Sequence, residues 1–207
     1  MNSRNYEFEQ QCKVIAWCDK RVNQCAALEE IVGSANGEKR ETKVNRRGQR
    51  YCPAGDRLKR SGVRAGFPDL QLPVQMKIEG IVYGALFIEM KAITFPHNVN
   101  DKPLKVKYGV TSAEQAKVQH NLKAFGNFVT TCYSADTINK THGTQRIQHS
   151  GAIDVICGYL GLDRAMMEVG HCYPNWHADW CKKMGLPLCV APYFHDKGFN
   201  DDIPFGK

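Results

Sequence analysis

An apolar stretch that contains two charged residues constrains the fold of this chain more than any other feature. Residues 85–92 read ALFIEMKA, and every residue except Glu89 and Lys91 is apolar. Side chains alternate between the two faces of a strand, so Glu89 and Lys91 share one face whereas Met90 points to the other. A strand this apolar is expected at the centre of a sheet. There a buried carboxylate and ammonium are costly unless they are paired or bind a metal ion.

A third charged residue stands at the start of an earlier predicted strand, which covers residues 69–74 (DLQLPV). This strand and the run from Ile81 onward most simply pair as an antiparallel hairpin, which would bring Asp69 to the sheet edge that holds Glu89 and Lys91. Two carboxylates and a lysine suit phosphodiester hydrolysis, because carboxylate oxygens hold Mg²⁺ and a lysine stabilises negative charge. The alternative is a structural Glu–Lys pair beside an ordinary turn at Pro68-Asp69.

The remaining pattern predicts helices on either side of these strands. A helix is expected over Tyr6–Val22, with Phe8, Cys12, Ile15 and either Cys18 or Val22 on its buried side. Ser112 is expected to cap a helix that runs to about Phe125 and ends at Gly126. We further expect a short helical piece in residues 55–62, a strand in residues 127–134, a helix over Ser150–Leu160, and loops at 33–66 and 94–111. This order predicts an α/β layered domain.

Composition narrows the class of protein. A length of 207 residues with 43% hydrophobic residues suits one globular domain with a small appendage. We expect no membrane span and no secretory signal, because no apolar run approaches the length of a span and the first residues are polar. The chain is therefore expected in the cytoplasm. Its 9 cysteines contain no CxxC pair, which favours reduced, mostly buried thiols over a disulfide framework.

The positive charge of the chain is concentrated in one window. Residues 38–64 hold ten cationic side chains against Glu38, Glu41 and Asp56, so this window alone equals the net charge of +7 of the whole chain. A concentrated basic stretch is typical of proteins that bind a polyanion, because each neutralised phosphate releases counterions. A solvated basic loop without a partner explains the charge alone equally well.

The C-terminal tail is rich in histidine, cysteine and tryptophan. His171, Cys172, His177 and Cys181 are metal-capable and close in sequence, which leaves a zinc site open although their spacing fits no standard pattern. The favoured alternative is that the tail packs on the domain through Trp176, Trp180 and Tyr193, or forms a partner surface.

Five segments follow one another in a recognisable order, namely YEFEQQCKVIAW (6–17), SANGEKR (34–40), RLKRSGVRAGFPDLQLPV (57–74), YGALFIEMKA (83–92) and TSAEQAKVQHNLKAFG (111–126). In this order they resemble the VRR-NUC branch of the PD-(D/E)xK nuclease superfamily. The closing GAIDVICGYL (151–160) is also similar to the last helix of the family. The resemblance covers residues 4–161 and implies a restriction-endonuclease-like core, in which helices flank a central mixed β-sheet in the order α-β-β-(β)-α-β-α. It divides the chain into a nuclease domain (1–161) and a C-terminal extension (162–207).

The resemblance also assigns roles within the site. It implies that Asp69 and Glu89 are ligands of Mg²⁺, with Mn²⁺ able to substitute, that Lys91 is the catalytic lysine, and that Gln115 faces the active site. It implies a third ligand from the first helix, where Glu7 matches best by its spacing to Trp17 and Glu9 is the alternative. A solvated carboxylate at the helix start explains either acid equally well. The two acids are about 200° apart around the helix axis, so both cannot face one metal ion.

DNA is the implied substrate. The residues expected near its phosphates are Asn36, Lys39, Arg40, Arg46, Arg47, Arg50, Lys59 and Arg60. The resemblance implies an endonuclease selective for branched junctions or flaps in phage or bacterial replication or recombination, acting in some relatives as a homodimer. Three additions depart from the family pattern, namely NRRGQRYCPAG (45–55), the long loop 94–111, and THGTQRIQHSG (141–151). Two alternatives remain, a non-catalytic nucleic-acid-binding module of the same fold and a zinc-dependent hydrolase centred on the tail.

Overall fold

The structure is a computed structural model, and it describes residues 3–34, 43–44, 46–52, 60, 64–95, 106–142 and 145–186. The chain divides into two compact units, Met1–Pro174 and Asn175–Lys207. The second unit contains the helix α6 (Trp176–Met184). The first unit extends beyond residue 161 and includes α5 (Arg164–Glu168), while the role of the C-terminal extension stays a prediction. No helix among the described residues is long and apolar enough to cross a membrane.

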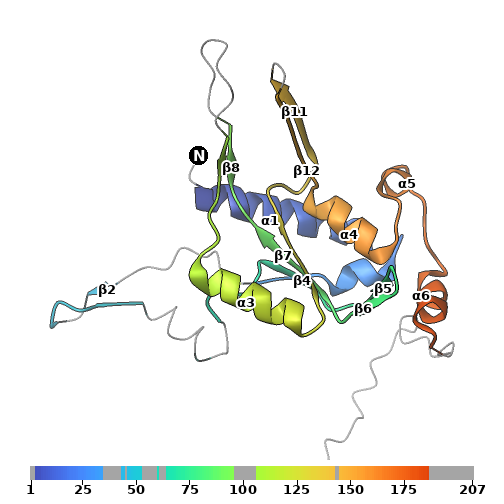
Figure 1. Ribbon diagram of the computed structural model, residues 1–207, viewed down its shortest axis with the longest axis horizontal. Coiled ribbons are helices and arrows are strands. Elements are labelled where there is room, and N and C mark those ends of the chain that lie inside the picture. The colour runs from blue at the N-terminus through green and yellow to red at the C-terminus, as the bar shows by residue number, and fades with distance from the viewer. Residues whose placement is uncertain are drawn as a thin grey trace, which may run out of the picture. The chain divides into compact units, whose positions relative to one another are not determined.

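A four-stranded mixed sheet forms the centre of the first unit (Figure 1). Its strands are β1 (Val32–Gly33), β4 (Leu70–Leu72), β7 (Leu86–Met90) and β10 (Phe128–Cys132), in the order β1-β4-β7-β10. Strand β4 pairs antiparallel with β7, with Leu70 opposite Ile88, and β10 pairs parallel with β7, with Thr131 opposite Glu89. The predicted antiparallel pairing of the two motif strands is confirmed.

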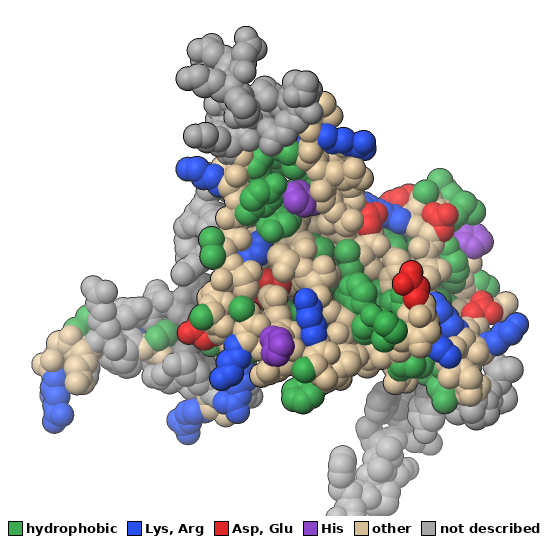
Figure 2. All heavy atoms as spheres, viewed as in Figure 1, with side chains coloured by type: hydrophobic (Ala, Val, Ile, Leu, Met, Phe, Trp, Pro, Cys, Tyr) green, Lys and Arg blue, Asp and Glu red, His purple; other side chains and the backbone are tan. Residues whose placement is uncertain are grey.

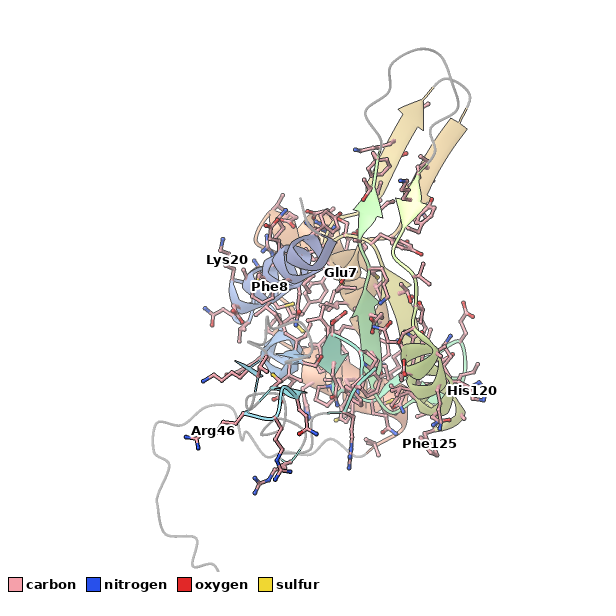
Figure 3. The ribbon with its side chains drawn as sticks, turned by 90° about the vertical axis from the view of Figure 1, so that its left-hand side faces the viewer. Glu7, Phe8, Lys20, Arg46, His120 and Phe125 are labelled. Atoms are coloured by element: carbon pink, nitrogen blue, oxygen red, sulfur yellow. The ribbon has the colours of Figure 1, made fainter. Side chains whose placement is uncertain are left out.

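Helices cover both faces of this sheet. Figures 1 and 3 show α1 (Ser3–Asp19) and α4 (Ala152–Leu160) on one side and α3 (Ala113–Ala124) on the other. All five residues of β7 are buried, as their apolar sequence predicts for a central strand. On the α3 side, Phe67 and Leu122 pack against Phe87 and its buried neighbours. The prediction of an α/β fold with a central mixed sheet and flanking helices is confirmed.

Helix α3 begins with the predicted cap. The Ser112 hydroxyl accepts from the Gln115 backbone N–H at 3.2 Å, and the Gln115 side-chain oxygen accepts from the Ser112 backbone N–H at 2.9 Å. Gly66, in the turn before Asp69, has a φ of +79°, and a Cβ there would lie 2.8 Å from the Glu114 carbonyl carbon. The turn that presents Asp69 therefore packs directly against the first turn of α3, and only glycine fits this contact.

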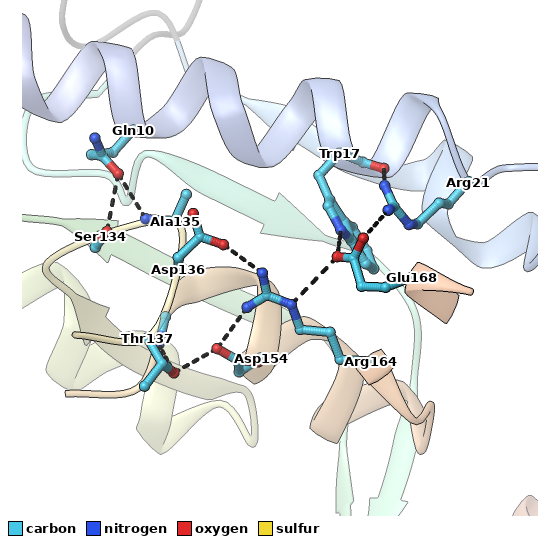
Figure 4. A network of polar contacts seen from close by, with 11 residues as sticks. Gln10, Trp17, Arg21, Ser134, Ala135, Asp136, Thr137, Asp154, Arg164 and Glu168 are labelled. Atoms are coloured by element: carbon cyan, nitrogen blue, oxygen red, sulfur yellow. Dashed lines mark hydrogen bonds and ion pairs between the residues drawn. The ribbon is translucent and has the colours of Figure 1, made fainter. Parts of the chain in front are cut away.

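The predicted buried side of the first helix is wrong at Phe8 and Cys12 and right at Cys18. Phe8 is 55% exposed and Cys12 is exposed, whereas Cys18 is buried together with Gln10, Val14 and Trp17. Gln10 is buried because its side-chain oxygen accepts from the Ser134 hydroxyl and the Ala135 backbone N–H, at 3.1 and 3.0 Å (Figure 4). The buried side of the helix therefore includes a polar residue, Gln10, whose hydrogen bonds satisfy its side-chain oxygen inside the protein.

The run 81–93, expected as one strand, is divided among three strands. Strand β6 (Ile81–Tyr83) pairs with β5 (Met76–Ile78), and β8 (Ile93–Thr94) pairs with β9 (Lys107–Tyr108). The motif strands β4 and β7 are thus joined through a small additional hairpin. Strand β9 lies in a stretch expected as loop, and a second hairpin, β11 (Ile138–His142) with β12 (Gln145–His149), was not expected. The predicted helical piece at 55–62 falls almost wholly outside the described residues.

A polar network joins α1 to the C-terminal part of the first unit (Figure 4). The Trp17 indole N–H donates to Glu168 at 2.8 Å, and Arg21 forms an ion pair with the same carboxylate. Arg164 pairs with Asp136 and, at 2.9 Å, with Asp154. The remaining described elements are η1 (Ala26–Glu30), β2 (Lys43–Val44) and β3 (Arg50–Tyr51), the last two forming an antiparallel pair.

Candidate active site

Glu89 and Lys91 form a buried ion pair at the end of β7. The Lys91 Nζ lies 2.9 Å from Glu89 Oε1, and the two residues are only 6% and 1% exposed. The alternation of the strand places both side chains on one face, as the sequence predicts. A charged pair at this depth loses most of its hydration, so its position depends on the polar groups that surround it.

Asp69 lies directly beside this pair. It follows the buried Pro68 and precedes β4, and its Oδ2 accepts from the backbone N–H of Met90 at 2.8 Å. Its backbone oxygen accepts from the Ser34 N–H at 2.7 Å and from the Gln11 side-chain amide at 3.1 Å. Contacts with β7, with the residue after β1 and with α1 therefore hold Asp69 at the C-terminal end of β7, beside Glu89 and Lys91.

Gln115 bridges the two charged residues from the opposite helix. Its Nε2 donates to Glu89 Oε1, and its Oε1 accepts from Lys91 Nζ at 2.9 Å. The same Oε1 closes the capping box with Ser112, so the first turn of α3 fixes the orientation of the amide. Gln115 therefore contacts both members of the pair.

Glu7 reaches the site from α1 and Glu9 does not. The Glu7 Oε1 accepts from the backbone N–H of Ala92 at 2.8 Å, immediately after Lys91. Figure 3 shows Glu7 on the side of α1 that faces the sheet, whereas Glu9 is exposed to solvent. Of the two acids proposed for the third carboxylate, the geometry places Glu7 at the end of β7.

Burial and mutual repulsion raise the proton affinity of these carboxylates. The pKa of Glu89 rises to about 7 because burial penalises its charged form and the charge of Asp69 repels it, against the opposing effect of Lys91. Burial also raises the pKa of Asp69, against the hydrogen bond from Met90. The second oxygen of Glu89, Oε2, is buried and has no hydrogen-bond partner among the described residues. Burying a polar atom without a hydrogen-bond partner costs free energy, and a bound cation would supply the missing partner.

The donor set fits a hard divalent cation. Glu7, Asp69 and Glu89 supply only carboxylate oxygens, which are the ligands that Mg²⁺ and Mn²⁺ prefer. Each of these carboxylates directs one oxygen to a protein N–H group. Within the described ranges, no three side chains of His, Cys, Asp or Glu already converge on one point as a metal cage does. Mg²⁺ usually keeps several waters and needs few direct protein ligands, so this open arrangement agrees with its chemistry.

The structure describes only part of the predicted DNA-binding set. Arg46 and Arg47 are exposed at the turn between β2 and β3, and Arg60 is exposed. Asn36, Lys39, Arg40 and Lys59 lie outside the described residues, as does the side chain of Arg50. Their contribution to binding stays a prediction.

The histidines and cysteines of the tail form no metal cluster among the residues that the structure describes. Within α6, the Cys181 sulfur lies 3.9 Å from His177 Nδ1, and the Trp176 and Trp180 rings are stacked with centroids 6.4 Å apart. His171 packs edge-on against Tyr173, in the first unit. The Trp176–Trp180 and His171–Tyr173 contacts are those of packed aromatic rings.

Sequence reasoning missed two residues that position the site. Gln11 donates to the Asp69 backbone, and Gly66 permits the close contact between the Asp69 turn and α3. Gly66 stands in the Gly-Phe-Pro-Asp segment that drew attention to Asp69, so its position was a usable signal. Gln11 had none, because a glutamine on a helix carries no pattern that predicts a contact with a distant backbone oxygen.

Comparison with known proteins adds little to these observations. No protein-family model matches the chain, and no curated protein matches it. A solved structure described as "VRR_NUC domain protein" aligns with a TM-score of 0.45 and 20% sequence identity, covering 76% of this chain and 89% of that chain. A TM-score this low establishes neither a shared fold nor a family, so function is proposed from the site itself.

Proposed function

We propose that this chain is a metal-dependent nuclease that hydrolyses DNA phosphodiester bonds. The observation that carries the proposal is the meeting of Asp69, Glu89 and Lys91 at the end of one buried strand. Gln115 from the facing helix and Glu7 from the first helix complete the group. Burying several ionisable groups together has a large free-energy cost, and such clusters concentrate at catalytic sites.

The metal ion in this proposal is Mg²⁺, with Mn²⁺ as its substitute, held by Asp69, Glu89 and Glu7. Such an ion polarises a phosphate oxygen and lowers the pKa of a bound water. Glu89 Oε2 is buried and lacks a partner among the described residues, so coordination of the ion by this atom would remove the cost of burying it unpaired. A cation beside Glu89 would also lower the pKa of its carboxyl and keep it ionised near neutral pH.

The protein's own residues have separate tasks in this reaction. The Lys91 ammonium stabilises the negative charge that develops on the phosphate oxygens in the transition state. Gln115 holds Lys91 and Glu89 in a fixed relation, because its amide donates to one and accepts from the other. The depth of the pair within the protein strengthens these electrostatic interactions, since less water screens them.

We also propose that the enzyme selects branched DNA, either a four-way junction or a flap, in replication or recombination. The support is the resemblance of the motifs to the VRR-NUC family together with the two hairpins that follow β7 and β10. The same resemblance suggests a homodimer, which light scattering of the intact protein would test.

A cleavage panel tests the proposed function. Linear, flap, fork and four-way DNA substrates are incubated with the intact protein in Mg²⁺ or Mn²⁺, with EDTA as the control. We expect a branched substrate to be cut fastest and EDTA to abolish cleavage of every substrate. Failure to cut any substrate with either ion would overturn the proposal. Cleavage that persists in EDTA would overturn the role of the metal.

A further inference from the structure

Two hairpins project from the end of the sheet that carries the candidate active site. Strand β8 begins two residues after Lys91, and the β11–β12 hairpin follows β10, the parallel neighbour of β7. Figures 1 and 3 both show the two hairpins extending from the same end of the sheet. They contact each other, because Tyr108 Oη lies 3.1 Å from His149 Nε2 and Lys140 Nζ lies 3.9 Å from the centroid of the Phe95 ring.

An aromatic cluster of Tyr108, Tyr133 and His149 lies where the two hairpins meet. The Tyr108 ring centroid is 5.1 Å from that of Tyr133 and 5.4 Å from that of His149, and Tyr133 and His149 are 4.9 Å apart. Tyr108 remains 44% exposed, so part of its ring is open to solvent. Rings that serve only to join two hairpins are expected to be buried, since burial is the source of their stabilising effect.

The aromatic cluster is joined to the catalytic residues by short backbone contacts. The Tyr6 hydroxyl, one residue before Glu7, donates to the Tyr133 backbone oxygen at 2.9 Å. The Lys91 N–H donates to the Cys132 oxygen at 2.9 Å, and the Gly109 N–H donates to the Ala92 oxygen at 2.8 Å. Tyr133 follows Cys132 and Tyr108 precedes Gly109, so both rings stand beside residues bonded to the end of β7.

The charged residues on the described strands of the two hairpins are all positive. Lys107, Lys140 and Arg146 are exposed on the two hairpins, and the described residues of β8, β9, β11 and β12 include no aspartate or glutamate. In Figure 2, hydrophobic side chains and a histidine gather below the projecting hairpins, with lysine or arginine side chains on both flanks. Exposed aromatic rings flanked by cations are what an unpaired nucleic-acid strand requires, because bases stack on the rings and phosphates pair with the cations.

We propose that the aromatic cluster and the cations Lys107, Lys140 and Arg146 form a binding site for single-stranded DNA beside the active site. A base stacks on the exposed face of Tyr108, and Lys140, which shares a face of its hairpin with His149, holds an adjacent phosphate. Lys107 and Arg146, on the opposite faces of their hairpins, hold phosphates farther along the strand. The proposal rests on the proposed nuclease function, and it specifies the substrate as DNA that presents unpaired nucleotides next to the cleaved bond. A fully paired duplex, whose bases are stacked on one another, has no base available for the cluster.

The test measures binding without catalysis. A fluorescent oligothymidylate and a blunt duplex of the same length are titrated with the intact protein in EDTA. We expect Tyr108→Ala to weaken binding of the oligothymidylate about tenfold, the loss typical of one stacked base, and to change duplex binding by less than about twofold. Tyr108→Phe retains the ring and should bind like the wild type. Phe125→Ala removes an aromatic residue that is 80% exposed on another part of the surface, and it should change neither affinity.

A second variant keeps the three rings of the aromatic cluster in place and tests the cations. The triple substitution of Lys107, Lys140 and Arg146 by Ala alters only exposed side chains, and it should reduce the salt dependence of oligothymidylate binding by about 0.7 log units per lost phosphate contact. Unchanged oligothymidylate binding in both variants, or equal losses for oligothymidylate and duplex, would overturn the inference. If the wild type instead binds neither DNA, the proposed function fails as well, so the two failures are distinguishable.

Discussion

The Glu7 carboxylate accepts a hydrogen bond from the backbone N–H of Ala92 at 2.8 Å, although 85 positions separate the two residues. This contact ties the first helix to the residue that follows Lys91. It also separates Glu7 from Glu9, which is exposed on the same helix. If Glu7 is the third metal ligand, Glu7→Gln should lower the cleavage rate by at least about a hundredfold, because the ion loses a charged oxygen.

Glu9→Gln is the matched control for this substitution. It removes the same charge from the same helix, and it should leave the cleavage rate within about twofold of the wild type, as is usual for a surface substitution away from the site. The comparison is made at saturating Mg²⁺ with thermal unfolding recorded for both variants. A larger loss in Glu9→Gln than in Glu7→Gln would contradict the assignment.

Substitutions of Gln115 and Ser112 distinguish an effect on catalysis from an effect on the stability of α3. Gln115→Ala removes the bridge between Glu89 and Lys91 and should lower kcat more than it raises KM, because the pair loses its orientation. Ser112→Ala removes one bond of the same capping box and should reduce the free energy of unfolding by about 1 kcal/mol while kcat stays nearly constant. Parallel losses of kcat in both variants would mean that Gln115 acts only through the cap.

Much of the fold could be predicted because local signals agreed with tertiary packing. The apolar run of β7 predicted its central position, and Ser112 with Gln115 predicted the start of α3. The β11–β12 hairpin was missed because its sequence, INKTH and QRIQH, is largely polar and has little of the apolar alternation that marks a half-buried strand. The predicted buried face of α1 was wrong at Phe8 and Cys12, because the helical pattern did not indicate that Gln10 is buried through hydrogen bonds to Ser134 and Ala135.

The sequence indicated which residues could form the candidate site, but it did not indicate the hydrogen bonds that connect them. The spacing of Glu89 and Lys91 on one strand predicts a shared face, and the structure places both there in a buried pair. The contacts of Asp69 with the Met90 N–H and of Gln11 with the Asp69 backbone depend on how segments remote in sequence fold together. Pattern in one segment carries no information about such contacts, which is why their geometry required the structure.

The salt dependence of DNA binding tests whether the arginines at the β2–β3 turn contact DNA. Arg46 and Arg47 are exposed at the β2–β3 turn, and the sequence adds Arg50 to this group. Replacing all three with Ala should flatten the slope of log affinity against log salt by about 0.9 per lost duplex phosphate contact. Fluorescence anisotropy with duplex DNA at several salt concentrations measures this slope. A slope equal to that of the wild type would mean that the loop does not contact DNA.

The cysteines should differ sharply in reactivity. Burial raises the pKa of the Cys18, Cys132 and Cys157 thiols to about 12, so almost none of their thiolate is present near pH 8. Cys12 and Cys172 are exposed. Iodoacetamide should therefore alkylate Cys12 and Cys172 quickly in the folded protein and reach the three buried thiols only after denaturation, as peptide mass spectrometry would show. Fast labelling of Cys157 in the folded protein would contradict the described packing.

The central claim is that Asp69, Glu89 and Lys91 form the active centre of a metal-dependent nuclease, and the cleavage rate of Lys91→Ala tests it most directly. Lys123→Ala, at an exposed position on α3, is the matched control. The best substrate of the cleavage panel is incubated with each variant in saturating Mg²⁺. We predict that Lys91→Ala cuts at least about a hundredfold more slowly than the wild type, as is typical when one group that stabilises transition-state charge is lost, and that Lys123→Ala is unaffected. A folded Lys91→Ala variant that cuts at the wild-type rate would contradict the claim.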